Sequence, residues 1–232
     1  MKQLFISFCL LTTLSSFGQY TTNKDSIAAQ MKYAAKQELL DKYYPRNIDT
    51  LYGGYLSTFT YDFQPQGDQE KMIVTQARHT WSTAKAAMYY HDTSYISLSR
   101  HGFLFLRDVM WDKEYGGFYN LVTREGKPTT FIKQAYGNGF GIYALAAYYE
   151  CSGDTAALNL AKKAFGWLEQ YSHDPKYKGY YQYLERDGTP MKRPADEPGT
   201  SDMGYKDQNS SIHLLEAFTE LYKVWKDPLV KT

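Results

Sequence analysis

The stretch "DKEYGGFYNLVTREGKP" runs from Asp112 to Pro128, and the chain contains two further versions of it. "DTLYGGYLSTFTYDFQP" begins at Asp49 and "DPKYKGYYQYLERDGTP" begins at Asp174. All three start with Asp, have Tyr at the fourth place and Gly at the sixth, and end in Pro. A sequence that recurs at a period of this size indicates a repeat architecture.

Amphipathic helical patterns flank each copy. Before the copies, helices are predicted to open at Ser26 as N-cap, at Asp92-Thr93 and at Asp154-Thr155, and the first ends before Pro45. After the copies, helices are predicted over 69–90, 133–150 and 206–225. Within the later copies, "REGKP" and "RDGTP" place a Gly where a tight hairpin needs positive φ. The repeating unit is therefore helix, β-hairpin, helix.

Helix pairs of this length bury their apolar faces by packing side by side. Successive pairs that curve round an axis form an all-α fold, an α/α toroid, with the second helix of each pair inside. The copies then lie on one rim. About three pairs are present, and such toroids need about twice as many to close. Residues 19–232 are therefore expected to be part of a longer toroid.

The amino terminus has the pattern of an export signal. Lys2 precedes the apolar run "LFISFCLLTTL", and Ser16-Phe17-Gly18 offers a cleavage site, so residues 1–18 are predicted to be a signal peptide. The chain is then exported, to the periplasm or the exterior. Removing Lys2 lowers the formal charge from +1 to zero, which argues against nucleic acid or a membrane surface as partner. Cys151 is left without a disulfide partner.

Polar residues interrupt the predicted inner helices. Asn209, His213, Glu216 and Glu220 share one face of the last helix, and Arg78 lies beside an apolar stripe of the second. Spacing alone leaves two interpretations open, a polar lumen or a solvated helix face with a surface histidine.

The stretches "TQARHTW", "KQAYGNGFGIYALAAYYECSGDTAAL" and "KDQNSSIHLLEAFTELYKVWKDP" resemble the N-acylglucosamine 2-epimerase superfamily, in particular its cellobiose and mannose 2-epimerase branch. The resemblance covers the mature chain and implies an all-α fold of the (α/α)6-barrel type, of which residues 19–232 would be the amino-terminal half. It also implies epimerisation or isomerisation of a free mono- or disaccharide through an enediolate, with no redox cofactor. No metal is predicted, because a di-iron site would need a second pair spaced like His213 and Glu216. Histidines exchange the C2 proton in this chemistry, and a guanidinium stabilises the enediolate oxygens.

Matched residue by residue, the resemblance implies that Arg78 stabilises the enediolate and that His213 assists ring opening or protonates sugar oxygens. It implies substrate-binding roles for four further residues, namely Asn209, Tyr119, Tyr136 and Asn138. The family's two C2 acid–base histidines lie in its other half. His79, His101 and His173 are expected on outer or rim positions, so this chain alone is predicted to be inactive as an epimerase.

Two alternatives belong to other classes. A glycosidase on the same toroid needs two carboxylates spaced across the lumen, whereas Glu216 and Glu220 share one helix. A secreted carbohydrate-binding module, or a decayed enzyme, would leave an apolar inner face exposed unless two copies complete a ring as a homodimer.

Overall fold

The structure, a computed structural model, describes residues 23–192 and 204–231. The predicted signal peptide lies outside these residues. The chain divides into two compact parts, and the boundary between them in the sequence falls between Lys42 and Tyr43. No helix in the described ranges has the length and apolarity that crossing a bilayer requires.

The first part contains α1 (Lys24–Tyr33), which continues through the π-helical turns of η1 (Ala34–Leu40) into α2 (Asp41–Tyr43). The helical run ends before Pro45, as predicted. The predicted N-cap was wrong, because Asn23 is the capping residue and its side chain accepts a hydrogen bond from the backbone N–H of Ser26. Ser26 is thus inside the first turn and supplies the donor.

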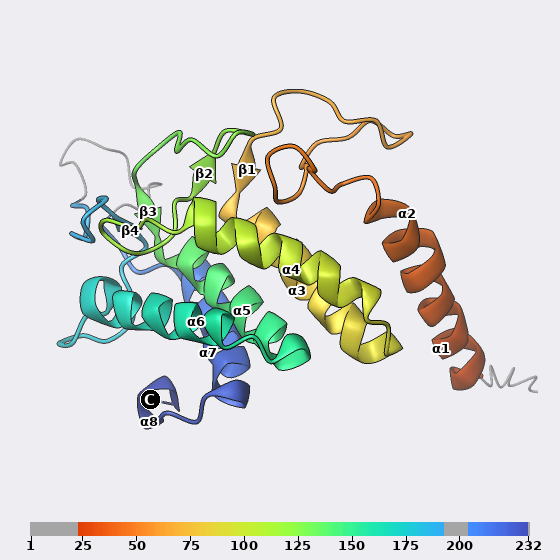
Figure 1. Cartoon of the computed structure of the whole chain (residues 1–232). Coiled ribbons are helices and arrows are strands. Elements are labelled where there is room, and N and C mark those ends of the chain that lie inside the picture. The colour runs from red at the N-terminus through yellow and green to blue at the C-terminus, as the bar shows by residue number, and fades with distance from the viewer. Residues whose placement is uncertain (1–22, 193–203, 232) are drawn as a thin grey trace, which may run out of the picture. The chain divides into compact units, whose positions relative to one another are not determined.

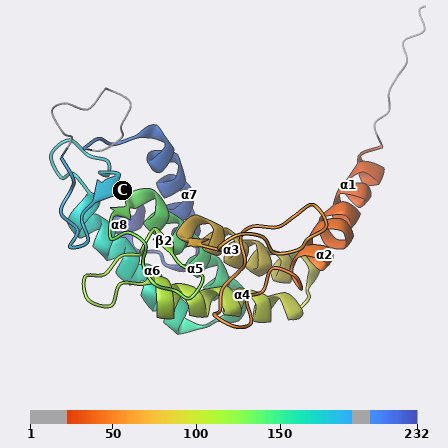
Figure 2. The ribbon, with the colours of Figure 1, turned by 90° about the horizontal axis from the view of Figure 1, so that it is seen from above.

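The second part consists of two layers of helices, which confirms the predicted helix pairs. The inner row is α3 (Ile73–Tyr90), α5 (Ala135–Ser152) and α7 (Gln208–Val224). The outer layer is α4 (Ser94–Phe105) and α6 (Thr155–Trp167), which end in η2 (Leu106–Met110) and η3 (Leu168–Ser172), and a short α8 (Pro228–Lys231) follows α7. Within the inner row, α5 packs against both α3 and α7, while α4 packs on α3 and α6 on α5 (Figures 1 and 2).

The inner helices begin later than predicted, because short strands precede two of them. These strands are β1 (Lys71–Met72) and β3 (Lys133–Gln134). They pair antiparallel with β2 (Leu121–Val122) and β4 (Tyr183–Leu184) respectively. The strand before each of these inner helices therefore pairs with the hairpin of the next repeat, and its backbone is held extended rather than helical.

The three recurring stretches form loops at one end of the inner helices, and we call them rim loop 1 (49–65), rim loop 2 (112–128) and rim loop 3 (174–190). Gly126 and Gly188 have φ of 93° and 95°, so the predicted hairpin glycines are confirmed in rim loops 2 and 3. In rim loop 1, Phe63 adopts positive φ instead. The loops thus share a frame and differ at the hairpin tip.

A buried ionic joint connects successive rim loops. Asp112 accepts hydrogen bonds from the backbone N–H groups of Glu114 and Tyr115, and its carboxylate lies 3.0 Å from Lys133 Nζ and 2.9 Å from Arg186 Nε. Lys133 is fully buried and also donates to the carbonyls of Gly116 and Arg186. The aspartate belongs to rim loop 2 and the arginine to rim loop 3, so the joint spans two repeats.

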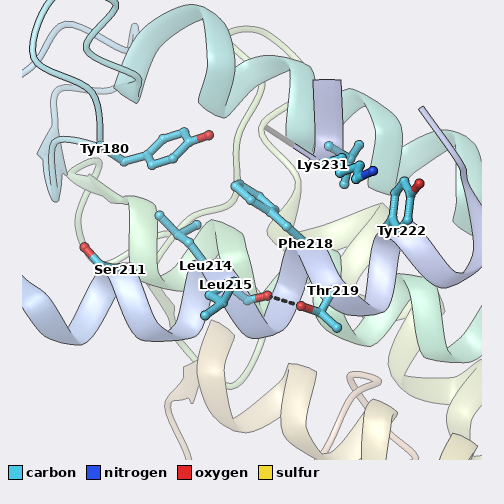
Figure 3. A pocket seen from close by; sticks show the side chains of 10 residues that line it. Tyr180, Ser211, Leu214, Leu215, Phe218, Thr219, Tyr222 and Lys231 are labelled. Carbon is cyan, nitrogen blue, oxygen red and sulfur yellow. Dashed lines mark hydrogen bonds between the residues drawn. The ribbon is translucent and has the colours of Figure 1, made fainter. Parts of the chain in front are cut away.

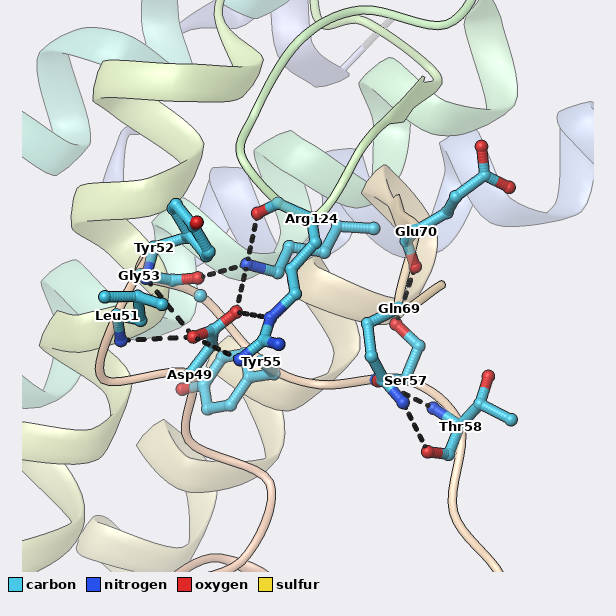
Figure 4. Close-up of polar contacts among 12 residues, drawn as sticks. Asp49, Leu51, Tyr52, Gly53, Tyr55, Ser57, Thr58, Gln69, Glu70 and Arg124 are labelled. Carbon is cyan, nitrogen blue, oxygen red and sulfur yellow. Dashed lines mark hydrogen bonds and ion pairs between the residues drawn. The ribbon is translucent and has the colours of Figure 1, made fainter. Parts of the chain in front are cut away.

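The same joint occurs one repeat earlier (Figure 4). Asp49 of rim loop 1 lies 2.9 Å from both Lys71 Nζ and Arg124 Nε, and Arg124 comes from rim loop 2. Lys71 Nζ also donates to the carbonyls of Gly53 and Arg124, at 2.7 and 2.9 Å. All three ammonium hydrogens are therefore used, which is the condition under which a buried lysine is tolerated.

We predict that Asp112→Asn lowers the free energy of unfolding by about 3–5 kcal/mol, because it leaves the buried Lys133 without its counter-ion. Arg186 loses one of its two carboxylate partners and keeps Glu114. Asp187→Asn, which removes an exposed rim carboxylate, is the control and should change it by less than about 1 kcal/mol. Urea unfolding followed by circular dichroism measures both. Equal effects would show that the joint contributes no more than ordinary surface charge.

The joints also predict a stability that falls in acid. Burial alone would raise the pKa of Asp49 and Asp112, but hydrogen bonds from Arg124 or Arg186 and from the lysines outweigh it and hold both pKa values well below the ordinary range. A lowered folded-state pKa stabilises the fold at neutral pH, and this contribution is lost as pH falls below about 4, the ordinary value. As the pH is lowered below 5, the Asp112→Asn variant should lose less stability than the unmodified chain. Differential scanning calorimetry at several pH values can test this.

Candidate functional site

Three of the predicted site residues meet around Phe140 on the inner row. Phe140 lies on α5 between Arg78 of α3 and His213 of α7. The Arg78 guanidinium carbon is 4.7 Å from the Phe140 ring centroid, and the ring centroids of Phe140 and His213 are 4.8 Å apart. Tyr136, one turn earlier on α5, meets the His213 ring edge-on at 5.0 Å. The structure therefore brings Arg78, Tyr136 and His213 into one cluster.

The glycines of "GNGFG" on α5 let its neighbours approach closely. A Cβ on Gly139 would lie 3.0 Å from the Leu214 side chain of α7, and a Cβ on Gly141 would overlap the Phe118 ring of rim loop 2. Any larger residue at these places would push α7 or the loop outward. The sequence of α5 thus sets the distance between Phe140 and His213.

His213 is oriented by a carboxylate on its own helix. Its Nδ1 lies 2.8 Å from Glu216 Oε2, one turn along α7. The His213 side chain is 19% exposed and that of Glu216 is 53% exposed, so the pair is open to solvent from the glutamate side. When Nδ1–H donates to the carboxylate, Nε2 of the neutral ring carries the lone pair. Nε2 is then the atom able to exchange a proton with a ligand.

Two further layers follow along the inner helices, away from the rim. Trp81 of α3 stacks on Tyr143 of α5, with centroids 4.9 Å apart and planes 14° from parallel. Burial raises the pKa of Tyr143 to about 12, and the negative charges of Glu220 and Glu216 add to this shift. Tyr143 therefore remains a neutral hydroxyl across the physiological range.

The last layer is an ionic network that ties the three inner helices. Lys85 of α3 lies 2.6 Å from Glu150 of α5 and 2.9 Å from Glu220 of α7. Burial alone would lower the pKa of Lys85, but the two carboxylates raise it, so the lysine stays charged. Glu220 is 9% exposed and also pairs with Lys223. These carboxylates are occupied as structural counter-ions.

The layers follow from three lysines that each pair with the first aspartate of a rim loop, since Lys206 binds Asp174 as Lys71 binds Asp49 and Lys133 binds Asp112. Arg78, Phe140 and His213 are each the seventh residue after Lys71, Lys133 and Lys206, which precede the three inner helices. Trp81, Tyr143 and Glu216 are each the tenth, and Lys85, Ala147 and Glu220 are each the fourteenth. The first two layers thus lie at equivalent positions of the repeat that carry different chemistry. In the ionic layer α5 contributes Glu150, which lies three residues beyond the equivalent position of Ala147.

Asn138 makes hydrogen bonds that hold rim loop 2. It is fully buried, its Oδ1 accepts from the Phe118 backbone N–H at 2.8 Å, and its Nδ2 donates to the Gln134 carbonyl at 2.9 Å. Gln76 of α3 holds the backbone of Tyr55 in rim loop 1 through two similar bonds. Both amides anchor a rim loop, so the hydrogen bonds of Asn138 favour a structural role over contact with a ligand.

Tyr119 and Asn209 lie apart from the Phe140 contacts. Tyr119 is a buried residue of rim loop 2 whose hydroxyl accepts from Arg186 at 3.2 Å, so it belongs to the second joint. Its pKa is raised by burial, although Arg186 offsets part of this effect. Asn209 is exposed in the first turn of α7, one turn before His213.

The other predicted histidines have local partners. His79 is on α3 but turns to Tyr44, whose hydroxyl lies 3.1 Å from its Nδ1, and burial lowers its pKa to about 4. His101 bonds the Gly54 carbonyl of rim loop 1, and His173 lies 3.3 Å from Glu169. Over residues 23–192 and 204–231, no group of three or more His, Cys, Asp or Glu side chains could hold a metal ion.

Four contributors to the inner face were not identified from sequence, namely Trp81, Lys85, Phe140 and Tyr143. The sequence does contain a pattern that could have identified them, because equivalent residues lie the same number of positions after each of the three lysines. Each inner helix follows its lysine at a constant offset, but Lys206 lies eleven residues farther from rim loop 3 than Lys133 lies from rim loop 2. If the three repeats are aligned by their rim loops, the residues of α7 are therefore out of register with those of α3 and α5.

Known proteins resemble this chain over most of its length. The profile of the N-acylglucosamine 2-epimerase (GlcNAc 2-epimerase) family matches residues 54–229. Among curated relatives, a cellobiose 2-epimerase of Ruminococcus albus is 33% identical over 194 residues, which are 81% of this chain and 48% of the relative. One of Bacteroides fragilis is 29% identical over 207 residues, 85% of this chain and 51% of the relative. The chain thus spans about half the length of these relatives.

Solved structures resemble the chain over a similar share. Cellobiose 2-epimerase from Spirochaeta thermophila superimposes with a TM-score of 0.82 at 28% identity, covering 92% of this chain and 53% of that one. A D-mannose isomerase gives 0.72 at 20% identity, and a family 76 glycoside hydrolase from a Bacteroides thetaiotaomicron strain gives 0.65 at 18% identity. The last two show a shared fold alone, the helical toroid.

We predict that Glu216 fixes the tautomer of His213. In the unmodified chain, nitrogen-15 NMR of the neutral ring should place the proton on Nδ1 and the lone pair on Nε2. Glu216→Ala removes the acceptor and should mix the two tautomers, whereas Glu216→Gln keeps a carbonyl oxygen and should preserve the original one. A proton on Nε2 in the unmodified chain would contradict this geometry.

Proposed function

Because the chain belongs to the N-acylglucosamine 2-epimerase family, we propose that it supplies the part of a sugar 2-epimerase site that binds the aldose and stabilises its enediolate. The observation that carries the proposal is the cluster of Arg78, Tyr136 and His213 around Phe140. A cation, an oriented imidazole and two aromatic faces suit a polar ligand with apolar C–H surfaces.

The proposed chemistry acts on the open-chain form of a free aldose or of a disaccharide reducing end. A base removes the proton from C2, and the electron pair moves through the new C1–C2 double bond onto the C1 oxygen. The guanidinium of Arg78 stabilises this developing negative charge. His213 Nε2 exchanges protons with the sugar oxygens during ring opening. Return of a proton to the other face of C2 gives the epimer, with no change of oxidation state and no redox cofactor.

The acid–base pair at C2 is proposed to come from the portion of the family that this chain does not match. His79, His101 and His173 are bound to Tyr44, the Gly54 carbonyl and the Glu169 side chain, which supports leaving them out of the reaction. The names of the curated relatives support cellobiose as a candidate substrate. The resemblance of the sequence to the mannose 2-epimerase branch leaves mannose as a second candidate within the same chemistry.

A glycosidase is less well supported. Its mechanism needs one carboxylic acid and one carboxylate on opposite sides of the scissile bond. On the inner face, Glu150 and Glu220 are paired with Lys85 and Glu216 with His213. A carbohydrate-binding module without catalysis would use the same cluster, and the experiment below separates it from an enzyme part. Export is proposed on the pattern of residues 1–18 alone.

We predict that residues 19–232 bind cellobiose or mannose through Arg78 but do not exchange the C2 hydrogen. Arg78→Gln should weaken binding at least about tenfold, which corresponds to about 1.4 kcal/mol, whereas Arg100→Gln on the exposed side of α4 should not. Titration calorimetry measures the binding, and proton NMR in heavy water measures the exchange.

The outcomes separate the proposals. Exchange by this chain alone would contradict an incomplete site. If Arg78→Gln leaves sugar binding unchanged, the cluster of Arg78, Tyr136 and His213 is not the sugar site. Binding by the chain, with exchange appearing only when it is joined to the remaining half of a family member, supports an enzyme part over a binding module.

A further inference from the structure

Each rim loop carries an exposed tyrosine at its fourth place. These residues are Tyr52, Tyr115 and Tyr177, which are 40%, 41% and 72% exposed. At the seventh place of rim loops 1 and 2, the aromatic residues Tyr55 and Phe118 are buried, as is usual for aromatic side chains that stabilise a core. Packing of the core therefore explains the seventh place and leaves the recurring tyrosine at the fourth place unexplained.

The backbone holds the three tyrosines in the same way. The aspartate that opens each loop accepts a hydrogen bond from the tyrosine N–H, at 3.2 Å for Asp49, 3.2 Å for Asp112 and 3.0 Å for Asp174. The N–H of the residue after each tyrosine donates to the backbone carbonyl of the same aspartate. The tyrosines are therefore fixed at equivalent points of the rim.

A cation lies beside each tyrosine ring. In chain order these cations are Arg124, Arg186 and Lys206, at 5.6, 4.9 and 5.9 Å from the ring centroids, and Figure 4 shows the first pair. Each cation is bound to the aspartate of the loop that carries the tyrosine, yet between 24% and 37% of its side chain remains exposed. The rim thus presents an aromatic face and a hydrogen-bond donor together, three times.

We propose that Tyr52, Tyr115 and Tyr177 form a second carbohydrate site, on the rim, which binds a linear neutral oligosaccharide. A tyrosine ring offers a flat apolar surface to the C–H groups of a sugar, and the cation beside it donates charge-assisted hydrogen bonds to sugar hydroxyls. The three tyrosines belong to the rim loops, whereas the inner cluster belongs to α3, α5 and α7. The rim site does not depend on the proposed activity.

The spacing of the repeats selects an oligosaccharide over a single sugar. The tyrosines occupy equivalent places in neighbouring repeats, and helices that pack as α3, α5 and α7 do lie about 8–10 Å apart. A hexose ring is shorter than this, so one sugar contacts one tyrosine and a chain of sugars is needed to reach two. Contacts made by one chain reinforce each other, because the second contact forms within the complex. The affinity should therefore rise with chain length.

The bases of a single-stranded nucleic acid also stack on tyrosines, but the charge of the rim argues against that ligand. Nucleic acids of this kind bind in grooves whose positive charge follows the phosphate backbone. The formal net charge of this chain is +1, and each rim cation is already paired with an aspartate. A neutral glycan needs no excess of positive charge.

Another aromatic surface, an apolar groove of about 420 Å³ along α7, is the competing site for a glycan (Figure 3). Tyr180 of rim loop 3 lines it together with Phe218 and Tyr222 of α7. Tyr180 is the seventh residue of its loop, where rim loops 1 and 2 have the buried Tyr55 and Phe118. The groove therefore does not recur at those places, whereas the exposed tyrosines recur in all three loops.

The test measures the binding of cellohexaose and mannohexaose by titration calorimetry to the Arg78→Gln chain, in which the proposed inner site lacks its guanidinium. At least one hexaose should bind about tenfold more tightly than its disaccharide. Tyr115→Ala removes the middle tyrosine and should weaken this binding about tenfold, whereas Tyr115→Phe should preserve it. Tyr89→Ala is the control and should have no effect, because Tyr89 is 63% exposed at the end of α3 that lies away from the rim loops.

Tyr115→Ala also removes the ring that lies beside Arg186, so a second measurement leaves every rim tyrosine in place. Tyrosine rings labelled with carbon-13 report by NMR which of them a glycan contacts, and single Tyr→Phe variants assign the signals. Added hexaose should shift the signals of Tyr52, Tyr115 and Tyr177 and leave that of Tyr89 unchanged.

Three results would overturn the proposal. In the first, neither hexaose binds the Arg78→Gln chain more tightly than its disaccharide does, whether or not the unmodified chain binds sugar at the inner cluster. In the second, Phe218→Ala abolishes hexaose binding and Tyr115→Ala leaves it unchanged, which assigns the glycan to the groove along α7. In the third, oligothymidylate shifts the signals of the rim tyrosines and neither hexaose does.

Discussion

Fully paired buried charge is the constraint on which this structure depends. Each complete joint removes an aspartate and a lysine from water and adds the arginine of the next rim loop. Ions of this kind cost several kcal/mol each to desolvate, and the attraction between them compensates only when every donor is used. Here the lysine uses all three hydrogens on one carboxylate and two carbonyls. Only one arrangement of two neighbouring rim loops meets that demand, so the joints fix how repeats align.

That alignment reaches the inner face. The lysine of each joint immediately precedes an inner helix, and a helix turns by a fixed amount per residue. The seventh, tenth and fourteenth residues after each lysine are therefore brought to the same depth in α3, α5 and α7. Arg78, Phe140 and His213 meet because three lysines are held at one level, although these residues are far apart in the sequence. Local geometry at the rim thus determines which side chains face one another.

The sequence predicted the repeat, the helix pairs and the hairpin turns because these features rest on local patterns. Apolar periodicity, Asp at helix starts and Gly at positive φ act over a few residues. Resemblance to a family predicted six site residues, and in the structure three of them, Arg78, Tyr136 and His213, lie around Phe140. Local patterns did not predict the strand residues before α3 and α5, because their extended backbone depends on pairing with the next repeat. Asn138 had the right residue type for a ligand contact, but its partner is the Phe118 backbone, which spacing along one helix cannot reveal.

Sharing each arginine between neighbours also affects how the molecule opens. If one rim loop detaches, the carboxylate of the preceding loop loses a counter-ion, and the lysine beside it is exposed to water. Opening is therefore transmitted from repeat to repeat, as in linear arrays where most of the stability lies in the interfaces. Amide protection should then decrease along the row as blocks of whole repeats rather than helix by helix. A repeat held by joints on both sides should therefore open later than a repeat held by a single joint.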